Sequence, residues 1–281
     1  PLTRGRCLSR PPEDVIAEAR RLLLAGHAEI MISGINLRQY GRDHATFGDF
    51  WSLLRRLDAA LAPEFAGRGR FRISSLEPSQ LDDEGVETLM SCRMLCPQLH
   101  ISLQHASQPV LRRMGRGHYT AAMLQRAVER LRAHWPVMGL GADIIAGFPG
   151  EREEDVACLL DFVRETPFSY AHVFPYSRRA GTPAASMPGQ LSRAEKADRS
   201  ARAVAAAAEL HREFLTAMCG TEQDVLFEQI EDGWFTGHAP NGMKVYARGE
   251  DLHNTVRRVR IEGLQEEGLR GEICKAAKYV L

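Results

Sequence analysis

The chain has 281 residues, of which 44% are hydrophobic and 26% charged, and its formal net charge is zero. These values are typical of a soluble globular protein with room for a barrel-sized domain and a small second domain. No run of 18 apolar residues occurs, which excludes a membrane span, and zero net charge gives no bulk electrostatic support for a nucleic-acid partner. Six scattered cysteines do not form a disulfide framework and favour a reducing cytoplasm.

The first two thirds of the chain alternates between short apolar strands and amphipathic helices. Helices are predicted at 11–26, 46–61, 80–91 and 151–164, with Arg-rich helical segments that end at Ala133. Strands are predicted at 29–33, 71–75, 99–103, 142–146 and 169–174. This alternation, with 30 to 40 residues between strands, indicates a parallel sheet or barrel with right-handed crossovers.

The segment 141–151 organises this region, because a buried strand, a glycine-rich turn and a helix follow one another in it. Asp143 lies inside the strand, and a carboxylate there is costly unless another group pairs with it. Each of the five strands also ends in polar or glycine residues, among them Ser75, Glu77, Gln104, Gly147 and Tyr176. Because the carboxyl ends of parallel strands meet at one edge, these residues predict a ligand site there.

The remainder of the chain changes in character. Residues 178–190, rich in Gly and Pro, indicate a linker or mobile loop, and an Ala-rich helix is predicted at 191–219. From Thr221 short alternating strands at 225–228, 234–237, 244–247 and 254–261 are separated by Gly, Asn and Asp turns. They predict a small five-stranded barrel of the OB type, so that the chain divides into 1–219 and 220–281.

Spacing alone identifies no catalytic constellation. The turn at 147–151 is not a P-loop, because no Gly-Lys-Ser/Thr follows it. Cys92 and Cys96 could be half of a metal site, but two semi-buried thiols around a helix end is the preferred interpretation. His100 is interpreted as a core histidine with satisfied hydrogen bonds rather than a ligand. The arginines between 112 and 132 are either a solvated helix face or contacts to an anion or RNA phosphate.

Three strings then carry a specific resemblance. Residues 99–116 (LHISLQHASQPVLRRMGR) resemble H-I-P-L-Q-S-G-S-D-x-V-L-K-R-M-x-R, residues 143–151 (DIIAGFPGE) resemble D-x-I-V-G-F-P-G-E, and residues 172–184 (HVFPYSRRAGTPA) resemble H-V-F-P-Y-S-x-R-x-G-T-x-A. Together with Gly34-Ile-Asn-Leu and Ser74-Ser-Leu-Glu-Pro78, these strings resemble the radical-SAM methylthiotransferases. The resemblance covers nearly the whole chain, and the β-rich C-terminal part is similar to the RNA-binding TRAM domain.

The resemblance implies an α/β fold, an incomplete (β/α)6 radical-SAM barrel with five strands present, followed by a TRAM-like barrel. It implies S-adenosylmethionine and two [4Fe-4S] clusters as cofactors of the complete protein. One cluster is held in the family by a Cys-x3-Cys-x2-Cys loop that leaves one iron open for S-adenosylmethionine. Matched to the family, Pro1 to Gly5 stand three residues after the last of these cysteines, so we expect the chain alone to lack the cluster ligands and activity.

The resemblance also implies a set of cofactor contacts at the strand ends. Ser75, Glu77 and Gln104 are expected to make polar contacts, Arg116 to lie near the carboxylate, and Asp143 to belong to the same site. Ile145, Gly147, Phe148 and Tyr176 are expected around the adenine, with Gly147 allowing a close backbone approach to the ring. Where the family has Q-S-G-S-D, this chain has Gln104-His-Ala-Ser-Gln108. Ala in place of Gly narrows any close approach to the backbone there, and Gln108 in place of Asp removes a charge.

The family modifies adenosine 37 of tRNA or an aspartate of a ribosomal protein. Arg4-Gly-Arg6 and Ser75-Leu-Glu-Pro78 favour the branch that acts on threonylcarbamoyladenosine in the anticodon loop of tRNA. The enzyme is expected to be a monomer. The alternatives are the ribosomal-protein branch and a cluster-free protein that only binds RNA. Residues 221–281 contain 8 Lys and Arg against 11 Asp and Glu, so an RNA surface there must be local, and Arg257, Arg258 and Arg260 are the predicted contacts.

Overall fold

A computed structural model describes residues 5–274, so the opening Pro1 to Arg4 of the resemblance lies outside the described residues. Six strands form a curved parallel sheet in two pieces, with β1 (Glu29–Ile32) beside β2 (Arg70–Ile73) and a second piece in the order β3-β4-β5-β6. The second piece consists of β3 (Ser75–Leu76), β4 (Gln98–Gln104), β5 (Gly139–Ala146) and β6 (Tyr170–Pro175). Only Ser74 separates β2 from β3, so the two pieces contain the five predicted strands, with the second one broken.

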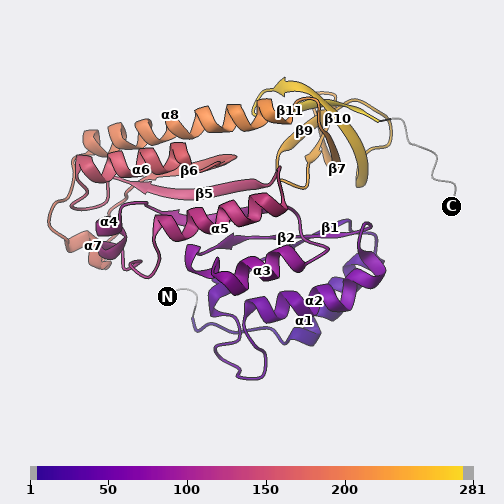
Figure 1. Ribbon diagram of the computed structural model, residues 1–281, viewed down its shortest axis with the longest axis horizontal. Coiled ribbons are helices and arrows are strands. Elements are labelled where there is room, and N and C mark those ends of the chain that lie inside the picture. Colours follow the sequence, from indigo (N-terminus) through magenta and orange to yellow (C-terminus); the bar gives the residue numbers. More distant parts are fainter. Residues whose placement is uncertain (1–4, 275–281) are drawn as a thin grey trace.

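Helices cover one face of this sheet (Figure 1). They are α1 (Pro12–Leu24), α2 (Phe50–Phe65), α3 (Asp83–Ser91), α4 (Gln108–Arg113), α5 (Ala121–His134) and α6 (Glu153–Glu165), with 3-10 turns at Leu37–Gln39 and Pro78–Gln80. The alternation of the strands explains the arrangement, because Leu99, Ile101 and Leu103 of β4 are buried in the helical core whereas His100, Ser102 and Gln104 are only half-buried on the opposite face. The uncovered face of β4 is therefore polar.

We call the two parallel sheets β1-β2 and β3-β4-β5-β6, with the helices that cover them, the half-barrel. Helix α8 (Arg193–Met218) connects the half-barrel to the second unit, and the short α7 (Pro183–Ser186) lies within the segment expected to be a linker. In Figure 1, α8 runs from the carboxyl ends of the parallel strands, at the left, to the small barrel at the right. Its first part packs against β6 and α6, and Leu215 and Met218 at its end belong to the core of the small barrel. None of the helices in residues 5–274 combines the length and hydrophobicity needed to cross a bilayer.

The C-terminal unit is a closed barrel of five strands in the order β10-β11-β9-β8-β7, as predicted. Its strands are β7 (Glu222–Glu231), β8 (Trp234–His238), β9 (Lys244–Ala247), β10 (Thr255–Gln265) and β11 (Gly268–Ile273). Pairing of β10 with β7 closes it. Inward side chains such as Val225, Phe227 and Leu269 fill the interior, each of them fully buried.

The carboxyl ends of the half-barrel strands and their amino ends differ in what they contact. At the amino ends, Glu29 binds Arg70 and Arg72 at 2.7 and 2.6 Å. The two guanidinium groups also donate to carbonyl oxygens of the small barrel, Arg70 to Asp224 and His238 and Arg72 to Ala239 and Pro240. This network joins the small barrel to the amino end of the half-barrel.

Several predicted boundaries were wrong. The helix expected from 46 begins at Phe50, where the Asp49 side chain caps the backbone N–H of Ser52, and it extends to Phe65. The helix expected from 80 begins after the Asp82 cap. Strand β5 begins at Gly139 rather than Ala142, because Gly139 and Gly141 pair with Gln98 and His100 of β4. A side chain at either position would overlap Asn241 or Tyr170. Glycine at these two positions permits close packing and does not break the strand.

Candidate functional site

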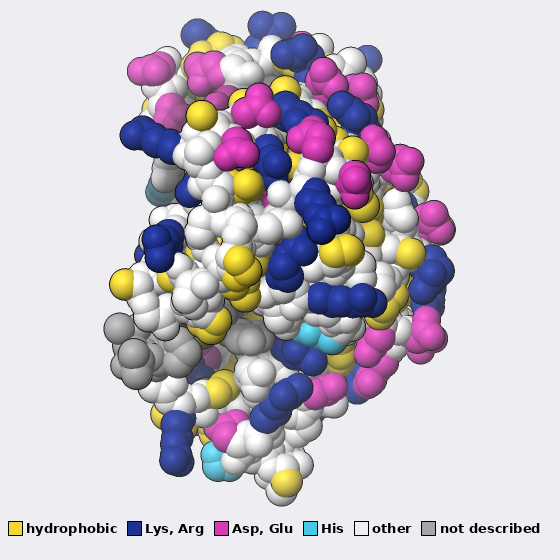
Figure 2. All heavy atoms as spheres, turned by 90° about the vertical axis from the view of Figure 1, so that its left-hand side faces the viewer, with side chains coloured by type: hydrophobic (Ala, Val, Ile, Leu, Met, Phe, Trp, Pro, Cys, Tyr) yellow, Lys and Arg dark blue, Asp and Glu magenta, His cyan; other side chains and the backbone are white. Residues whose placement is uncertain are grey.

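The carboxyl ends of the strands converge on one edge, which Figure 2 views directly. The loops after β3, β4, β5 and β6 all reach this edge. They bring together most of the residues that were predicted to form a cofactor site. Some of these side chains are hydrogen-bonded or ion-paired to other protein groups, and others are not.

Glu77, after β3, is the centre of an ion-pair network. Its carboxylate lies 3.1 Å from Arg38, 3.3 Å from Arg116 and 2.8 Å from His118. Burial raises the pKa of Glu77, but the hydrogen bond with His118 and the charges of Arg38 and Arg116 outweigh it and hold the pKa below its ordinary value. Arg116 thus shares the Glu77 carboxylate with Arg38 and His118, and this pairing makes it a weaker partner for a cofactor carboxylate than expected.

Other polar groups at this edge have unused bonding capacity. Gln104 ends β4 with φ of 65°, and its half-buried amide makes no hydrogen bond with any described side chain or backbone group. Ser75 of β3 is exposed, opposite His100 of β4. The hydroxyls of Ser74 and Tyr176 are buried and have no partner within residues 5–274, although buried hydroxyls are normally bonded. These donors and acceptors fit the ribose and amino-acid groups of S-adenosylmethionine.

The turn after β5 is fixed by Glu151. Its fully buried carboxylate accepts hydrogen bonds from the backbone N–H groups of Gly147 and Phe148 at 2.9 and 3.3 Å and from Arg199 of α8 at 3.0 Å. His105 Nε2 lies 3.4 Å away, without the direction of a hydrogen bond. Burial raises the pKa of Glu151, but His105, Arg199 and the backbone N–H of Phe148 outweigh it and hold the pKa below its ordinary value, so the group stays ionised. Sequence analysis missed Arg199 and His105, although His105 stands where the resemblance string departs from its family.

The predicted adenine slot differs from the expectation. Gly147 has φ of +77°, and a Cβ there would lie 2.5 Å from Cγ of Lys196, so α8 occupies the side on which a close approach of the ring was expected. Phe148 is only 6% exposed and packs edge-to-face on Tyr176 with ring centroids 5.2 Å apart. Ile145 is half-buried on the uncovered face of β5. Contact of these residues with a cofactor remains a prediction.

Asp143 lies on the same uncovered face, deeper than the strand end. Its carboxylate is 3.2 Å from His100 Nε2, and His100 Nδ1 is 3.0 Å from the Tyr170 hydroxyl. Asp143 is half-buried, and His100 is the partner that its carboxylate needs. His100 has both ring nitrogens paired, as expected, but it lies on the uncovered face of β4 rather than in the core. Asp143 is held by protein groups, so a role in cofactor binding would have to use its second oxygen.

The three arginines predicted to bind RNA lie on β10 and are all exposed. Arg258 pairs with Glu222 at 3.1 Å and with Asp224 at 3.2 Å. Arg257 and Arg260 make no ion pair within the described residues. The charge of Arg258 is thus partly compensated by β7, and contact of all three arginines with RNA remains a prediction.

The described residues do not fit an iron–sulfur cluster. Cys92 ends α3 and Cys96 precedes β4; both thiols are buried, and burial raises each pKa to about 12, whereas cluster ligands are thiolates. Cys96 donates to Glu29 at 3.7 Å in the amino-end network. Within residues 5–274 no three His, Cys, Asp or Glu side chains are grouped so as to hold a metal ion.

Comparisons with known proteins agree with this geometry. The Radical SAM superfamily matches residues 2–163. The chain is 37% identical over 267 residues to the threonylcarbamoyladenosine tRNA methylthiotransferase MtaB of Bacillus subtilis, covering 93% of this chain and 58% of the relative. It is 39% identical over 257 residues to the tRNA-2-methylthio-N(6)-dimethylallyladenosine synthase of Frankia casuarinae, covering 89% and 46%. The chain thus spans about half the length of these relatives.

Among solved structures, the coproporphyrinogen III oxidase HemN of Escherichia coli, a radical SAM enzyme, is similar over 73% of this chain and 46% of its own, with a TM-score of 0.55 and 17% identity. That likeness shows a shared fold. Radical SAM proteins use S-adenosylmethionine and a [4Fe-4S] cluster. The chain belongs to the Radical SAM superfamily and, within it, to the radical-SAM methylthiotransferases.

Proposed function

We propose that the complete protein is a methylthiotransferase that acts on adenosine 37 in the anticodon loop of tRNA, and that its substrate carries the threonylcarbamoyl group. Support comes from the family, from the unpartnered polar groups at the strand ends, and from the match to MtaB over 93% of this chain. The small barrel, by its five-stranded closed architecture, is proposed to be a TRAM-type RNA-binding unit, and the half-barrel to be part of a six-stranded barrel. We further propose that the complete protein is a monomer and is located in the cytoplasm.

The bound cluster and S-adenosylmethionine would supply the radical chemistry. The residues of this chain would bind and orient the cofactor. Gln104, Ser75 and the hydroxyls of Ser74 and Tyr176 would bind its polar groups, and the Glu151 carboxylate would hold the turn beside it in place. Asp143, His100 and Tyr170 line the polar face on which a substrate base would lie.

The test uses the complete protein, reconstituted with iron and sulfide and supplied with reductant and S-adenosylmethionine. Digestion of the product tRNA and mass analysis of its nucleosides should show the methylthio form of threonylcarbamoyladenosine. Because the Frankia relative is a synthase of the dimethylallyl product, tRNA with that group is the second substrate. Product from the dimethylallyl tRNA alone would overturn the substrate, and no product from either tRNA would overturn the activity.

A further inference from the structure

Four exposed arginines gather at the strand-end edge, and we call them the rim arginines: Arg112 of α4, Arg178 and Arg179 after β6, and Arg193 at the start of α8. None of them forms an ion pair with a described carboxylate. Figure 2 shows Lys and Arg side chains spread across the middle of this face. Between 176 and 196 the chain has four basic side chains and one acidic one, a local balance of +3.

Most acidic groups of this edge are already paired with other cations. Glu77 binds Arg38 and Arg116, and Glu151 binds Arg199. Asp155 lies 3.6 Å from Arg113, and both Glu153 and Asp198 pair with Arg202. Glu154 and Glu195 make no ion pair in the described part of the chain, so these two carboxylates offset part of the charge of the four rim arginines. A net positive charge remains where the candidate site opens.

Backbone contacts hold the segments that carry the rim arginines against one another. The N–H of Gly150, in the turn after β5, donates to the carbonyl of Gly189 at 2.8 Å. A Cβ on Gly150 would lie 3.6 Å from the guanidinium of Arg113, next to Arg112. The loop after β6, the turn after β5 and α4 thus form one continuous surface around Gly150.

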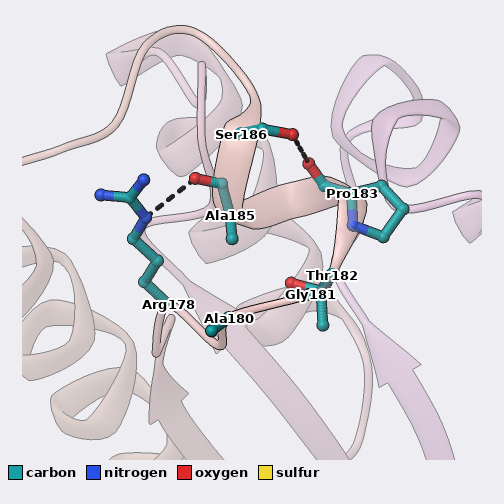
Figure 3. Close-up of a pocket in the computed structure, with 7 residues that line it drawn as sticks. All are labelled: Arg178, Ala180, Gly181, Thr182, Pro183, Ala185 and Ser186. Carbon is teal, nitrogen blue, oxygen red and sulfur yellow. Dashed lines mark hydrogen bonds between the residues drawn. The ribbon is translucent and has the colours of Figure 1, made fainter.

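Arg178 shows how a guanidinium is fixed at this surface (Figure 3). Its Nε donates to the carbonyl of Ala185 at 2.8 Å, and its two terminal nitrogens point away from that bond. Beside it is a shallow hollow of about 720 Å3 lined by Gly181, Thr182, Pro183 and Ser186. A guanidinium with a fixed orientation and two free terminal nitrogens is suited to phosphate oxygens.

We propose that the rim arginines bind backbone phosphates of the RNA substrate next to the nucleotide that enters the strand-end site. Several charges spread over an open face match a chain of regularly spaced phosphates better than one small anion. In the small barrel Arg258 is paired with Glu222 and Asp224, which leaves Arg257 and Arg260 as the arginines of β10 without a described ion pair, against four on the rim. The inference rests on the proposed function, since it assigns to RNA the surface around that same site.

The experiment measures binding of fluorescently labelled tRNA to the 281-residue chain by anisotropy between 50 and 300 mM KCl. The test variant is Arg178→Ala/Arg179→Ala/Arg193→Ala. The control, Arg126→Ala/Arg132→Ala/Arg212→Ala, removes the same charge from α5 and the far part of α8, where these arginines also lack ion pairs within the described part of the chain. Because Arg178 helps to order its loop, Arg179→Ala/Arg193→Ala is measured as well, as those two side chains make no described hydrogen bond.

We expect the test variant to bind roughly tenfold or more weakly at 100 mM salt, with the slope of log affinity against log salt reduced by about 2 to 3, since each lost phosphate contact reduces it by roughly 0.7 to 0.9. The control should bind like the parent, and the double variant should show about two thirds of the slope change of the test variant. Equal binding by test and control variants overturns the inference, as does a parent that does not bind tRNA.

A second arm separates phosphates from the substrate's own carboxylate. The loss should be equal for tRNA with and without the threonylcarbamoyl group, and a loss confined to the modified tRNA would overturn the assignment to phosphates. The failure of the proposed function is separately visible. If the complete protein forms the product and the rim variant binds tRNA as the parent does, the inference is wrong and the proposed function stands. If the rim variant binds tRNA more weakly and the complete protein forms no methylthio product, the proposed function is wrong and the inference stands.

Discussion

The two ends of the parallel strands use similar residues for opposite purposes. At the amino ends, Glu29, Arg70 and Arg72 bond to one another and to carbonyls of the small barrel, so that each charge has a partner. At the carboxyl ends, Gln104 and the Tyr176 hydroxyl lack partners among the described residues, and the rim arginines lack carboxylates. Bonded polar groups hold the two units together, whereas unbonded ones are available to a ligand.

The largest effect should come from the amino ends. Replacing Glu29 by Ala leaves the guanidinium groups of Arg70 and Arg72 buried without their carboxylate, which should lower the free energy of unfolding by about 3 to 5 kcal/mol. Urea denaturation followed by circular dichroism measures this loss. Glu64→Ala is the matched control, because the ion pair of Glu64 with Arg20 is exposed to solvent. Such a pair should contribute less than about 1 kcal/mol to the free energy of unfolding. Equal losses in both variants would contradict the role given to this network.

Acid should reproduce part of that loss. Burial raises the pKa of Glu29, but Arg72 and Arg70 outweigh it, and the pKa lies below the ordinary 4.5. A lowered folded-state pKa means that the stabilisation is present above pH 4.5 and is lost as the pH falls through the folded-state value. The urea midpoint of the parent should therefore fall between pH 6 and pH 3, with Glu151 contributing in the same direction. Glu29→Gln should show a weaker dependence on pH, and an unchanged dependence would contradict this origin.

How much of this contrast could be predicted depends on the range of the interactions. Alternating apolar residues placed the strands, and so placed Gln104 and Tyr176 at one edge. The partners of these side chains could not be predicted, because Glu151 and Arg199 are 48 residues apart and Arg72 and Ala239 are 167 apart. Gly139 looks like a strand breaker by composition, yet it is a strand residue because Asn241 packs against it. Sequence pattern thus predicts position, and tertiary packing decides which polar groups remain free.

Two tyrosines near the carboxyl ends test whether an unbonded hydroxyl there is costly to the fold. Tyr119 donates to the carbonyl of Leu103 at 2.6 Å, whereas the buried Tyr176 hydroxyl has no described partner. Tyr119→Phe should lower the free energy of unfolding by about 1 kcal/mol, and Tyr176→Phe should leave it unchanged or raise it by a similar amount. Thermal denaturation of both variants checks this, and equal destabilisation would show that Tyr176 is bonded in solution.

The smallest effect on stability, and the sharpest comparison, is expected within one strand. Gln98 begins β4 and is buried with its amide 3.4 Å from the Tyr170 hydroxyl, whereas Gln104 ends the same strand with a free amide. Gln98→Ala should cost about 1 kcal/mol of stability and leave cofactor binding unchanged. Gln104→Ala should change stability by less than about 0.5 kcal/mol. In the complete, cluster-loaded protein it should nevertheless weaken S-adenosylmethionine binding roughly tenfold by calorimetry, because a bonding partner in a buried polar site contributes about 1 to 3 kcal/mol. If Gln104→Ala binds the cofactor as tightly as the parent, the free amide at this end of β4 has a different purpose, and the unbonded hydroxyl of Tyr176 is the next group to test.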